Sequence, residues 1–284
     1  MTRTTHLERG AVVPRRLLFI TEPVRAVVDV GLLASTAPLL AVLPRGDGHP
    51  VLVVPGLGGA DTSTITLRAI LRRLGYRVHG WRLGRNVGPT PRAVNGMRAR
   101  LDDLTNRSGT PVSLIGWSLG GIYAGQLARR KPDAVRQVIT LASPVGLARR
   151  EPRTKARKEQ RTVNRLYDDW SGFPQWPHWS EWGRWYAELQ TEIPDLAFED
   201  GPLPMPTTSI YSPLDGMVGW QVCLNEPGPQ AENIAVAASH IAFAYHPAAI
   251  WAIADRLAQP AGQWAPFRPP PLLRAAYLQP GRQS

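Results

Sequence analysis

The residues that could carry nucleophilic chemistry begin with Ser118, which lies in a Gly-x-Ser-x-Gly pattern at residues 116–120. Such a pattern builds a sharp strand-to-helix turn that holds the serine in a sparsely populated backbone conformation, and its glycines let strand and helix approach closely. In a chain with 26 glycines the pattern alone is weak evidence, and a serine in a surface turn is the alternative. A predicted strand ends at the pattern and a predicted helix follows it, so we interpret Ser118 as the nucleophile.

A serine hydroxyl is a poor nucleophile at neutral pH and needs a general base. Of the six histidines, only His240 and His246 lie downstream of the last predicted strands. His240 follows the predicted strand 233–237, at the carboxyl edge where open α/β sheets place their sites. His246 directly precedes Pro247 and fits a helix-cap position better. We therefore predict His240 as the base, with His246 as the alternative.

The base needs a carboxylate to orient it, and Asp215 is the first candidate. It lies in a loop that follows the predicted strand 207–211. Its alternative role is that of a turn residue, since Asp-Gly is a common turn pair. Three other acidic residues precede the histidine but lie in or near an insertion rather than at a strand end, which makes them weaker candidates: Asp195, Glu199 and Asp200.

Acyl transfer through a serine also needs two N–H donors for the oxyanion, each of which stabilises the transition state by ~3 kcal/mol. One donor is expected from the backbone of Leu119, directly after the nucleophile. The other is expected from Leu57, in the glycine-rich loop 55–59 after the first predicted core strand. A phosphate-binding loop is the rival interpretation of this loop, but the Gly-Lys-Ser/Thr ending is missing.

These residues must be positioned by an alternation of strands and helices, and the hydrophobic pattern predicts one. Short apolar, β-branched runs alternate with segments of helical period, which is typical of an α/β fold with a mostly parallel sheet flanked by helices. The strands are expected at residues 51–54, 77–81, 112–117, 135–141, 207–211 and 233–237, and the helices at 67–74, 94–104, 119–130 and 247–257.

One insertion interrupts the alternation of strands and helices, and a further segment lies before it and after it. We predict an N-terminal helical segment (1–45), a core in two pieces (46–145 and 206–260), an insertion between them (146–205) and a proline-rich, extended tail (261–284). The N-terminal segment is expected to pack on the core, with a membrane-facing element as the alternative.

Together these features resemble the α/β-hydrolase fold family, most closely its serine esterases and lipases. The resemblance covers residues 51–257 without the insertion, and it rests on the glycine-rich loop, Ser118, Asp215 and His240. The chain departs from the pattern in having Pro55 where many lipases have histidine, and in lacking an evident N-terminal pair of strands. The resemblance implies that the insertion forms a helical cap or lid over the site.

The predicted cap carries an aromatic stripe, because Trp182, Trp185, Tyr186 and Leu189 follow the helical period. Packing of the cap against the core is the plainer explanation. The more specific explanation is a lid whose aromatic face contacts lipid, while the arginine-rich stretch 149–165 binds anionic head groups. We accordingly expect Trp182, Trp185 and, beside the nucleophile, Trp117 to bind substrate.

The amino-acid composition excludes several kinds of site and partner. A single cysteine, Cys223, excludes intramolecular disulfides and a cysteine-rich metal site. No metal or cofactor is expected. The net charge of +11 would attract nucleic acid or anionic lipid, but no nucleic-acid-binding module is recognisable and no such partner is expected. Charges at Glu22, Arg25 and Asp29 interrupt the apolar N-terminal stretch, so neither a signal peptide nor a transmembrane helix is expected. A cytoplasmic location is predicted, with membrane association as the alternative.

Three functions remain after the sequence analysis. The first is hydrolysis of a carboxylic ester with a hydrophobic acyl group or a lipid, through a Ser–His–Asp triad and an acyl-enzyme. The second is an acyltransferase or thioesterase that forms the same acyl-enzyme, which a triad cannot distinguish. The third is a non-catalytic, basic protein that binds lipid or nucleic acid, and a triad in the expected order argues against it.

Overall fold

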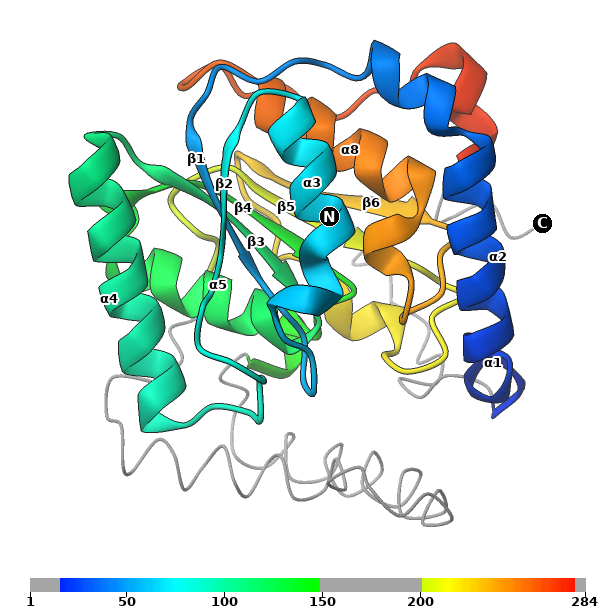
Figure 1. Cartoon of the computed structure of the whole chain (residues 1–284), viewed down its shortest axis with the longest axis horizontal. Coiled ribbons are helices and arrows are strands. Elements are labelled where there is room, and N and C mark those ends of the chain that lie inside the picture. The colour runs from blue at the N-terminus through cyan, green and yellow to red at the C-terminus, as the bar shows by residue number, and fades with distance from the viewer. Residues whose placement is uncertain (1–15, 149–200, 279–284) are drawn as a thin grey trace, which may run out of the picture.

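The computed structural model describes residues 16–148 and 201–278. Most of the predicted cap, including Trp182 and Trp185, therefore lies outside the described residues. Within them the chain builds one sheet with helices on both faces (Figure 1). The predicted α/β class is confirmed.

The sheet has seven strands in the order β2-β1-β3-β4-β5-β6-β7. All neighbouring pairs are parallel except β6 and β7, which are antiparallel. The chain leaves β1 toward β2 and returns on the other side of β1 as β3, so the strand order reverses between β1 and β3. Open α/β sheets bind ligands at the carboxyl ends of the strands beside such a reversal. The strands are β1 (Pro50–Val54), β2 (Arg77–Gly80), β3 (Val112–Trp117), β4 (Val135–Leu141), β5 (Thr207–Tyr211), β6 (Ala231–Val236) and β7 (Tyr277–Leu278).

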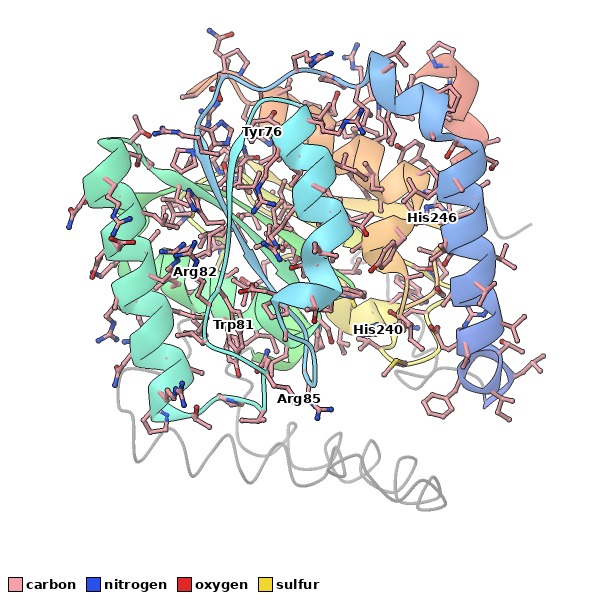
Figure 2. The ribbon with its side chains drawn as sticks, in the orientation of Figure 1. Tyr76, Trp81, Arg82, Arg85, His240 and His246 are labelled. Carbon is pink, nitrogen blue, oxygen red and sulfur yellow. The ribbon has the colours of Figure 1, made fainter. Side chains whose placement is uncertain are left out.

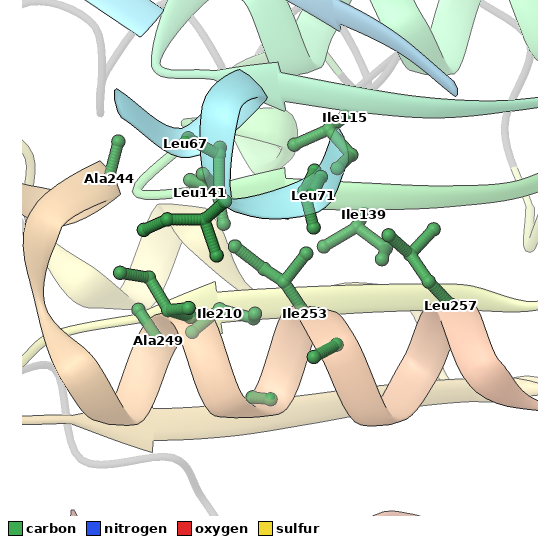
Figure 3. Packing of buried hydrophobic residues seen from close by; sticks show 14 of the residues in the cluster. Leu67, Leu71, Ile115, Ile139, Leu141, Ile210, Ala244, Ala249, Ile253 and Leu257 are labelled. Atoms are coloured by element: carbon green, nitrogen blue, oxygen red, sulfur yellow. The ribbon is translucent and has the colours of Figure 1, made fainter. Parts of the chain in front are cut away.

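In the part of the chain that the structure describes, two helices pack directly on each face of the sheet. Alternating residues of β1 divide between two clusters, because successive side chains of a strand point to opposite faces. Val51 and Val53 pack with α3 (Ile65–Arg73) and α8 (Pro247–Ala258). Figure 3 shows other residues of this cluster, such as Leu67 of α3 and Ile253 of α8. Leu52 and Val54 belong to the cluster that the other two helices form. Those two helices are α4 (Pro91–Ser108) and α5 (Leu119–Arg130).

A long helix near the N-terminus lies beside α8 and the short helix η7 (Figure 1). This helix, α2, begins at Glu22 with Pro23 in its first turn, where the missing N–H costs nothing. Its buried residues follow the helical period and include two carboxylates, Glu22 and Asp29. None of the helices in the described ranges has the length and apolar character needed to cross a bilayer. The accompanying short helices are α1 (Arg16–Ile20), η1 (Ala37–Val42) and η7 (Phe243–Tyr245).

The tail is more structured than the sequence pattern indicates. After an extended stretch it forms η8 (Pro271–Ala276) and then β7, which pairs with the end of β6 and makes the tail part of the sheet. The buried Arg256 helps to hold it, since its guanidinium donates to Glu232, 2.6 Å away, and to the Ala265 carbonyl. The other short helices are η2 (Asp61–Thr64), η3 (Pro132–Ala134), η4 (Val145–Ala148) and η6 (Trp220–Cys223).

Candidate active site

Ser118 lies at the turn between β3 and α5, with φ 52° and ψ −121°. This left-handed conformation costs a non-glycine residue about 1–3 kcal/mol and persists only where the surroundings enforce it. Part of the enforcement is a hydrogen bond from the Ser118 N–H to the Leu141 carbonyl at 2.8 Å. A Cβ on Gly116 would lie 2.3 Å from the Gly120 oxygen, and one on Gly120 would lie 2.4 Å from the Val54 oxygen. Both glycines of the pattern are therefore required by the close approach of strand, helix and β1.

The segment after β4 supports this turn from the other side. The buried Ser143 hydroxyl donates to the Gly116 carbonyl at 3.2 Å. A Cβ on Gly121 would lie 2.1 Å from Ser143 Oγ, so the glycine that directly follows the pattern is also required by packing. Ala142 itself has a positive φ of 47°. Two neighbouring strands thus end in strained conformations at this edge of the sheet.

The glycine-rich loop after β1 lies against the serine. A Cβ on Gly56 would be 3.1 Å from Ser118 Cβ. The N–H groups of Gly58 and Gly59 donate to the carbonyls of Asn86 and Gly56. No hydrogen bond within the described part of the chain uses the Leu57 N–H. Leu57 therefore has a donor available in a loop that touches the proposed nucleophile, and Leu119 supplies the first N–H of α5.

Asn86 fixes this loop, and sequence reasoning did not identify it. Its side chain is fully buried and donates from Nδ2 to the Pro55 carbonyl at 2.9 Å. Its backbone N–H donates to the Gly59 carbonyl at 2.7 Å. One residue of the loop after β2 therefore holds both ends of the loop after β1. The only signal in the sequence is an asparagine between glycines, a combination that usually indicates nothing more than a turn.

The structure brings Asp215 and His240 together. Asp215 Oδ2 lies 2.6 Å from His240 Nδ1, and both side chains are buried. Asp215 Oδ1 accepts hydrogen bonds from the N–H groups of Met217 and Val218, each at 2.7 Å. These two hydrogen bonds replace those that the carboxylate would make to water if it were exposed. Nδ1 is paired with Asp215, and Nε2 has no hydrogen-bond partner within residues 16–148 and 201–278. A proton on Nδ1 gives the tautomer that a general base requires.

The protonation behaviour of the two candidate histidines differs. Burial is the largest influence on the pKa of His240 and lowers it, but the charge and hydrogen bond of Asp215, followed by the charge of Glu22, raise this pKa above its usual value in total. Burial lowers the pKa of His246, which Asp29 only partly opposes. His246 is the N-cap of α8, which fits the structural role anticipated for it.

Ser118 and Trp117 make fewer of the expected contacts than Asp215 and His240. Ser118 and His240 both follow strands at the carboxyl edge, yet no hydrogen bond joins their side chains among the described residues. Catalytic hydrogen bonds are often long before substrate binds and shorten only in the complex with substrate. Trp117 is buried and packs in the cluster of α3 and α8, and its Nε1 has no partner among the described residues. Its predicted contact with substrate stays a prediction.

Sequence reasoning also missed the contacts of two carboxylates of α2, because it interpreted Glu22 and Asp29 only as charges that interrupt an apolar segment. Glu22 Oε1 accepts from the N–H of Gly216 at 2.7 Å, next to Asp215 in the chain. Asp29 Oδ2 accepts from the N–H of Ser239 at 2.9 Å, next to His240. The N-terminal helix therefore contacts both loops that carry the Asp–His pair.

A Ser–His–Asp group of other residues, in which hydrogen bonds join all three side chains, lies at the opposite edge of the sheet. His49 Nε2 is 2.8 Å from Ser113 Oγ, and His49 Nδ1 contacts Asp47. Tyr76, whose ring contacts His49, lies at the other end of the sheet from His240 (Figure 2). Ser113 is fully buried in β3, next to a shift in the register with β4 between Val112 and Ser113. This group can hold the amino ends of β1 and β3 together, but a substrate cannot reach its hydroxyl.

Two other features of the described residues fall outside this site. No group of three metal-ligating side chains occurs in residues 16–148 and 201–278. A surface cavity on the side of α5 is lined in part by Gln126, Arg129 and Glu226, and none of its lining residues is Ser118, Asp215 or His240. The cavity is therefore separate from the candidate active site.

Comparisons with known proteins point to esterases. No family model matches the chain. The chain is 28% identical over 166 residues to a pimeloyl-[acyl-carrier protein] methyl ester esterase of Klebsiella pneumoniae, covering 48% of this chain and 65% of that protein. It is 27% identical over 227 residues to the enzyme of the same name from Aeromonas hydrophila, covering 60% of this chain and 89% of that one. Among solved structures, mouse alpha/beta hydrolase domain-containing protein 10 aligns with a TM-score of 0.49 and 17% identity over 75% of this chain and 89% of the mouse chain.

Proposed function

We infer that the chain, a member of the α/β-hydrolase fold family, is a carboxylic ester hydrolase in which Ser118 is the nucleophile, His240 the general base and Asp215 its orienting acid. The observation that carries this proposal is the buried Asp215–His240 pair at the carboxyl edge of the sheet. Ser118, with its strained backbone conformation, follows β3 at the same edge. The carboxyl ends of β3, β5 and β6 lie at this edge of the sheet. The glycine-rich loop lies against Ser118, and its Leu57 N–H has no hydrogen-bond partner among the described residues.

Acylation follows from this arrangement. His240 Nε2 takes the proton of the Ser118 hydroxyl as the oxygen attacks the ester carbonyl. The tetrahedral intermediate carries an oxyanion, which the N–H groups of Leu57 and Leu119 stabilise. His240 then gives its proton to the leaving alcohol, and the bond between the carbonyl carbon and the alcohol oxygen breaks. Asp215 holds the imidazole in the productive tautomer and stabilises the transient imidazolium.

Deacylation repeats the sequence with water as the nucleophile. His240 removes a proton from the water as it attacks the acyl-enzyme, and returns that proton to Ser118 Oγ when the acid leaves. Each cycle consumes one ester and one water and releases one alcohol and one carboxylic acid, and it needs no redox partner.

The substrate we propose is an ester of a hydrophobic acyl group or a lipid, bound with the help of Trp117, Trp182 and Trp185. The two curated relatives are named for a methyl ester on a carrier-bound acyl chain, so methyl esters of hydrophobic acids are the first variants of this class to test. The excess of basic residues supports a peripheral contact with anionic membranes as a further part of the proposal. Liposome flotation at low salt, with and without anionic lipid, tests that contact.

The decisive experiment is an activity profile of the purified chain. p-Nitrophenyl esters and methyl esters of increasing acyl length are assayed together with labelling by a fluorophosphonate. We expect turnover that increases with acyl length, and labelling of Ser118. The Ser118→Ala and His240→Ala variants should lose turnover while keeping the fold. Undiminished turnover in either variant would refute the assignment.

The same acyl-enzyme could pass its acyl group to another acceptor, so an acyltransferase or thioesterase is the alternative. Adding alcohol or thiol acceptors to the ester assay separates the two. Mainly hydrolysed product supports the esterase, whereas mainly transesterified product favours the transferase.

A further inference from the structure

The buried end of α2 joins the two loops that carry the Asp–His pair. The Glu22 carboxylate is almost completely buried. Its Oε1 accepts from the N–H of Gly216 at 2.7 Å, and its Oε2 accepts from the N–H of Ile241 at 3.2 Å. Gly216 follows Asp215 in the chain and Ile241 follows His240. One carboxylate therefore bridges the residues next to the acid and next to the base.

We propose that Glu22 is a positioning residue for the reaction, which couples the loop of Asp215 to the loop of His240 and places a second negative charge beside the imidazole. This inference rests on the proposed role of His240 as the general base. Glu22 itself need not touch substrate or any reacting atom, since it acts through the two loops.

The fit between the helix and the acid loop is close. A Cβ on Gly216 would lie 2.4 Å from the Leu18 carbonyl oxygen, so any side chain at this position would push the loop away from α1. Arg25 donates to the Leu214 carbonyl at 2.6 Å and to Glu22 Oε1 at 2.7 Å. The acid loop is thus held by α1 and α2 at Leu214 and Gly216, the two residues on either side of Asp215.

The charged groups around His240 come from three parts of the chain. Asp215 follows β5, while Glu22, Arg25 and Asp29 lie on α2, and His246 precedes α8. Figure 2 shows both histidines on the side of the molecule where α2 lies. Among these groups, Asp215 and Glu22 raise the pKa of His240, and together they outweigh burial, which is the largest single influence and lowers this pKa.

A buried carboxylate is costly, and a neutral side chain could fill the same space. Its presence next to the base is explained if its charge favours the imidazolium that forms in each half-reaction, as Asp215 does from the other side. Because the Glu22 hydrogen bonds are made to backbone N–H groups, they also hold the two loops at a constant separation.

Asp29 provides a matched comparison on the same helix. It is buried, and it accepts hydrogen bonds from the N–H and the hydroxyl of Ser239, on the other side of His240 in the chain. Its charge acts on the pKa of His246. Asp29→Asn therefore removes a buried carboxylate and weakens a helix-to-loop contact while leaving the Glu22 charge in place.

The test is an NMR titration of the His240 ring in the full chain, combined with the pH profile of kcat/KM. In Glu22→Gln we expect the His240 pKa and the acid limb of the profile to move to lower pH. We also expect kcat to fall about tenfold with KM unchanged, because a displacement of the order of 1 Å costs up to ~100-fold. In Asp29→Asn the His240 titration should keep its wild-type position. Glu22→Asp, which retains the charge, should restore the acid limb.

An unshifted His240 titration in Glu22→Gln overturns the proposal, as does an equal shift in Asp29→Asn. If Glu22→Gln does not fold, Arg25→Gln is titrated instead. Removing the compensating positive charge should raise the His240 pKa, and an unchanged pKa again overturns the proposal. A wild-type chain without esterase activity would defeat the proposed function, but the titration would still decide whether Glu22 acts on His240.

Discussion

His240 Nδ1 and Asp215 Oδ2 lie 2.6 Å apart although 25 residues separate them in the chain. The two residues follow neighbouring parallel strands, β5 and β6, so the carboxyl edge of the sheet brings them together. Asp215 is fixed in turn by two N–H groups of its own loop. The imidazole is therefore oriented by a carboxylate that cannot easily turn away.

Asp215→Asn should remove this orientation while keeping the shape of the side chain. The amide can donate to Nδ1, which favours the tautomer with a protonated Nε2 and blocks the base. By analogy with the serine protease triad, we expect kcat to fall about 10⁴-fold. The measurement is single-turnover hydrolysis of an activated ester. Asp102→Asn, which changes a carboxylate paired with Lys131 on the exposed surface, is the matched control and should retain full activity.

Ser113→Ala should leave esterase activity unchanged, although Ser113 is hydrogen-bonded to a histidine. It should instead lower the free energy of unfolding by about 1–3 kcal/mol, because the buried Nε2 of His49 loses its partner. Urea denaturation and ester hydrolysis of the same preparation check both parts. Fluorophosphonate labelling of Ser113, or loss of turnover in this variant, would contradict the assignment of Ser118.

Asn86→Ala should weaken the loop that we expect to stabilise the oxyanion. Removal of Nδ2 leaves the buried Pro55 carbonyl without this donor, at a cost of about 1–3 kcal/mol in stability. We expect kcat to fall at least about tenfold with little change in KM, because the oxyanion interaction is made in the transition state. Steady-state kinetics test this. Asn95→Ala, on the exposed face of α4, is the control and should behave as wild type.

Acid should destabilise the protein through its buried histidines. Burial is the main cause that lowers the pKa values of His49, His79 and His246, whereas the pKa of His240 is raised. A lowered pKa means that the unfolded state binds more protons, so stability is lost as the pH falls below the unfolded value of about 6.5. His240 opposes this trend, but among the four histidines of the described residues the other three all have lowered pKa values. The free energy of unfolding should therefore be smaller at pH 5.5 than at pH 7.5. His246→Gln should reduce the difference, and a larger stability at pH 5.5 would contradict this interpretation.

Two glycines of α5 should respond to alanine in opposite ways. A Cβ on Gly120 would meet the backbone oxygen of Val54 at 2.4 Å, so Gly120→Ala should destabilise the fold by about 2–3 kcal/mol or more. A Cβ on Gly125 meets nothing within 4 Å, so Gly125→Ala should stabilise the helix by about 0.5–1 kcal/mol. Urea denaturation with an unchanged m-value checks both. Equal effects of the two substitutions would mean that the turn at Ser118 is looser than described.

Local sequence patterns were sufficient for the elements that carry the site. The strand before Ser118 and the helix after it have the predicted bounds, because a continuous apolar run and a glycine pattern encode them within a few residues. The order of Ser118, Asp215 and His240 could also be read from the sequence, since each follows a predicted strand. The start of β6 was predicted two residues late because Ala231 and Glu232 become strand residues only through pairing with β5.

Only the tertiary structure decided which residues support these elements. Glu22 reaches residues 194 and 219 positions away, and Asn86 reaches across to Pro55 from a neighbouring loop. Such contacts depend on how helices and loops pack on the sheet, so no local periodicity or spacing in the sequence predicts them. The same holds for β7, which forms because the tail meets a free edge of β6, and for the buried Ser113–His49 pair. Residue types and spacing therefore predicted the nucleophile and its chemistry, whereas packing decided what holds Asp215, His240 and the glycine-rich loop in place.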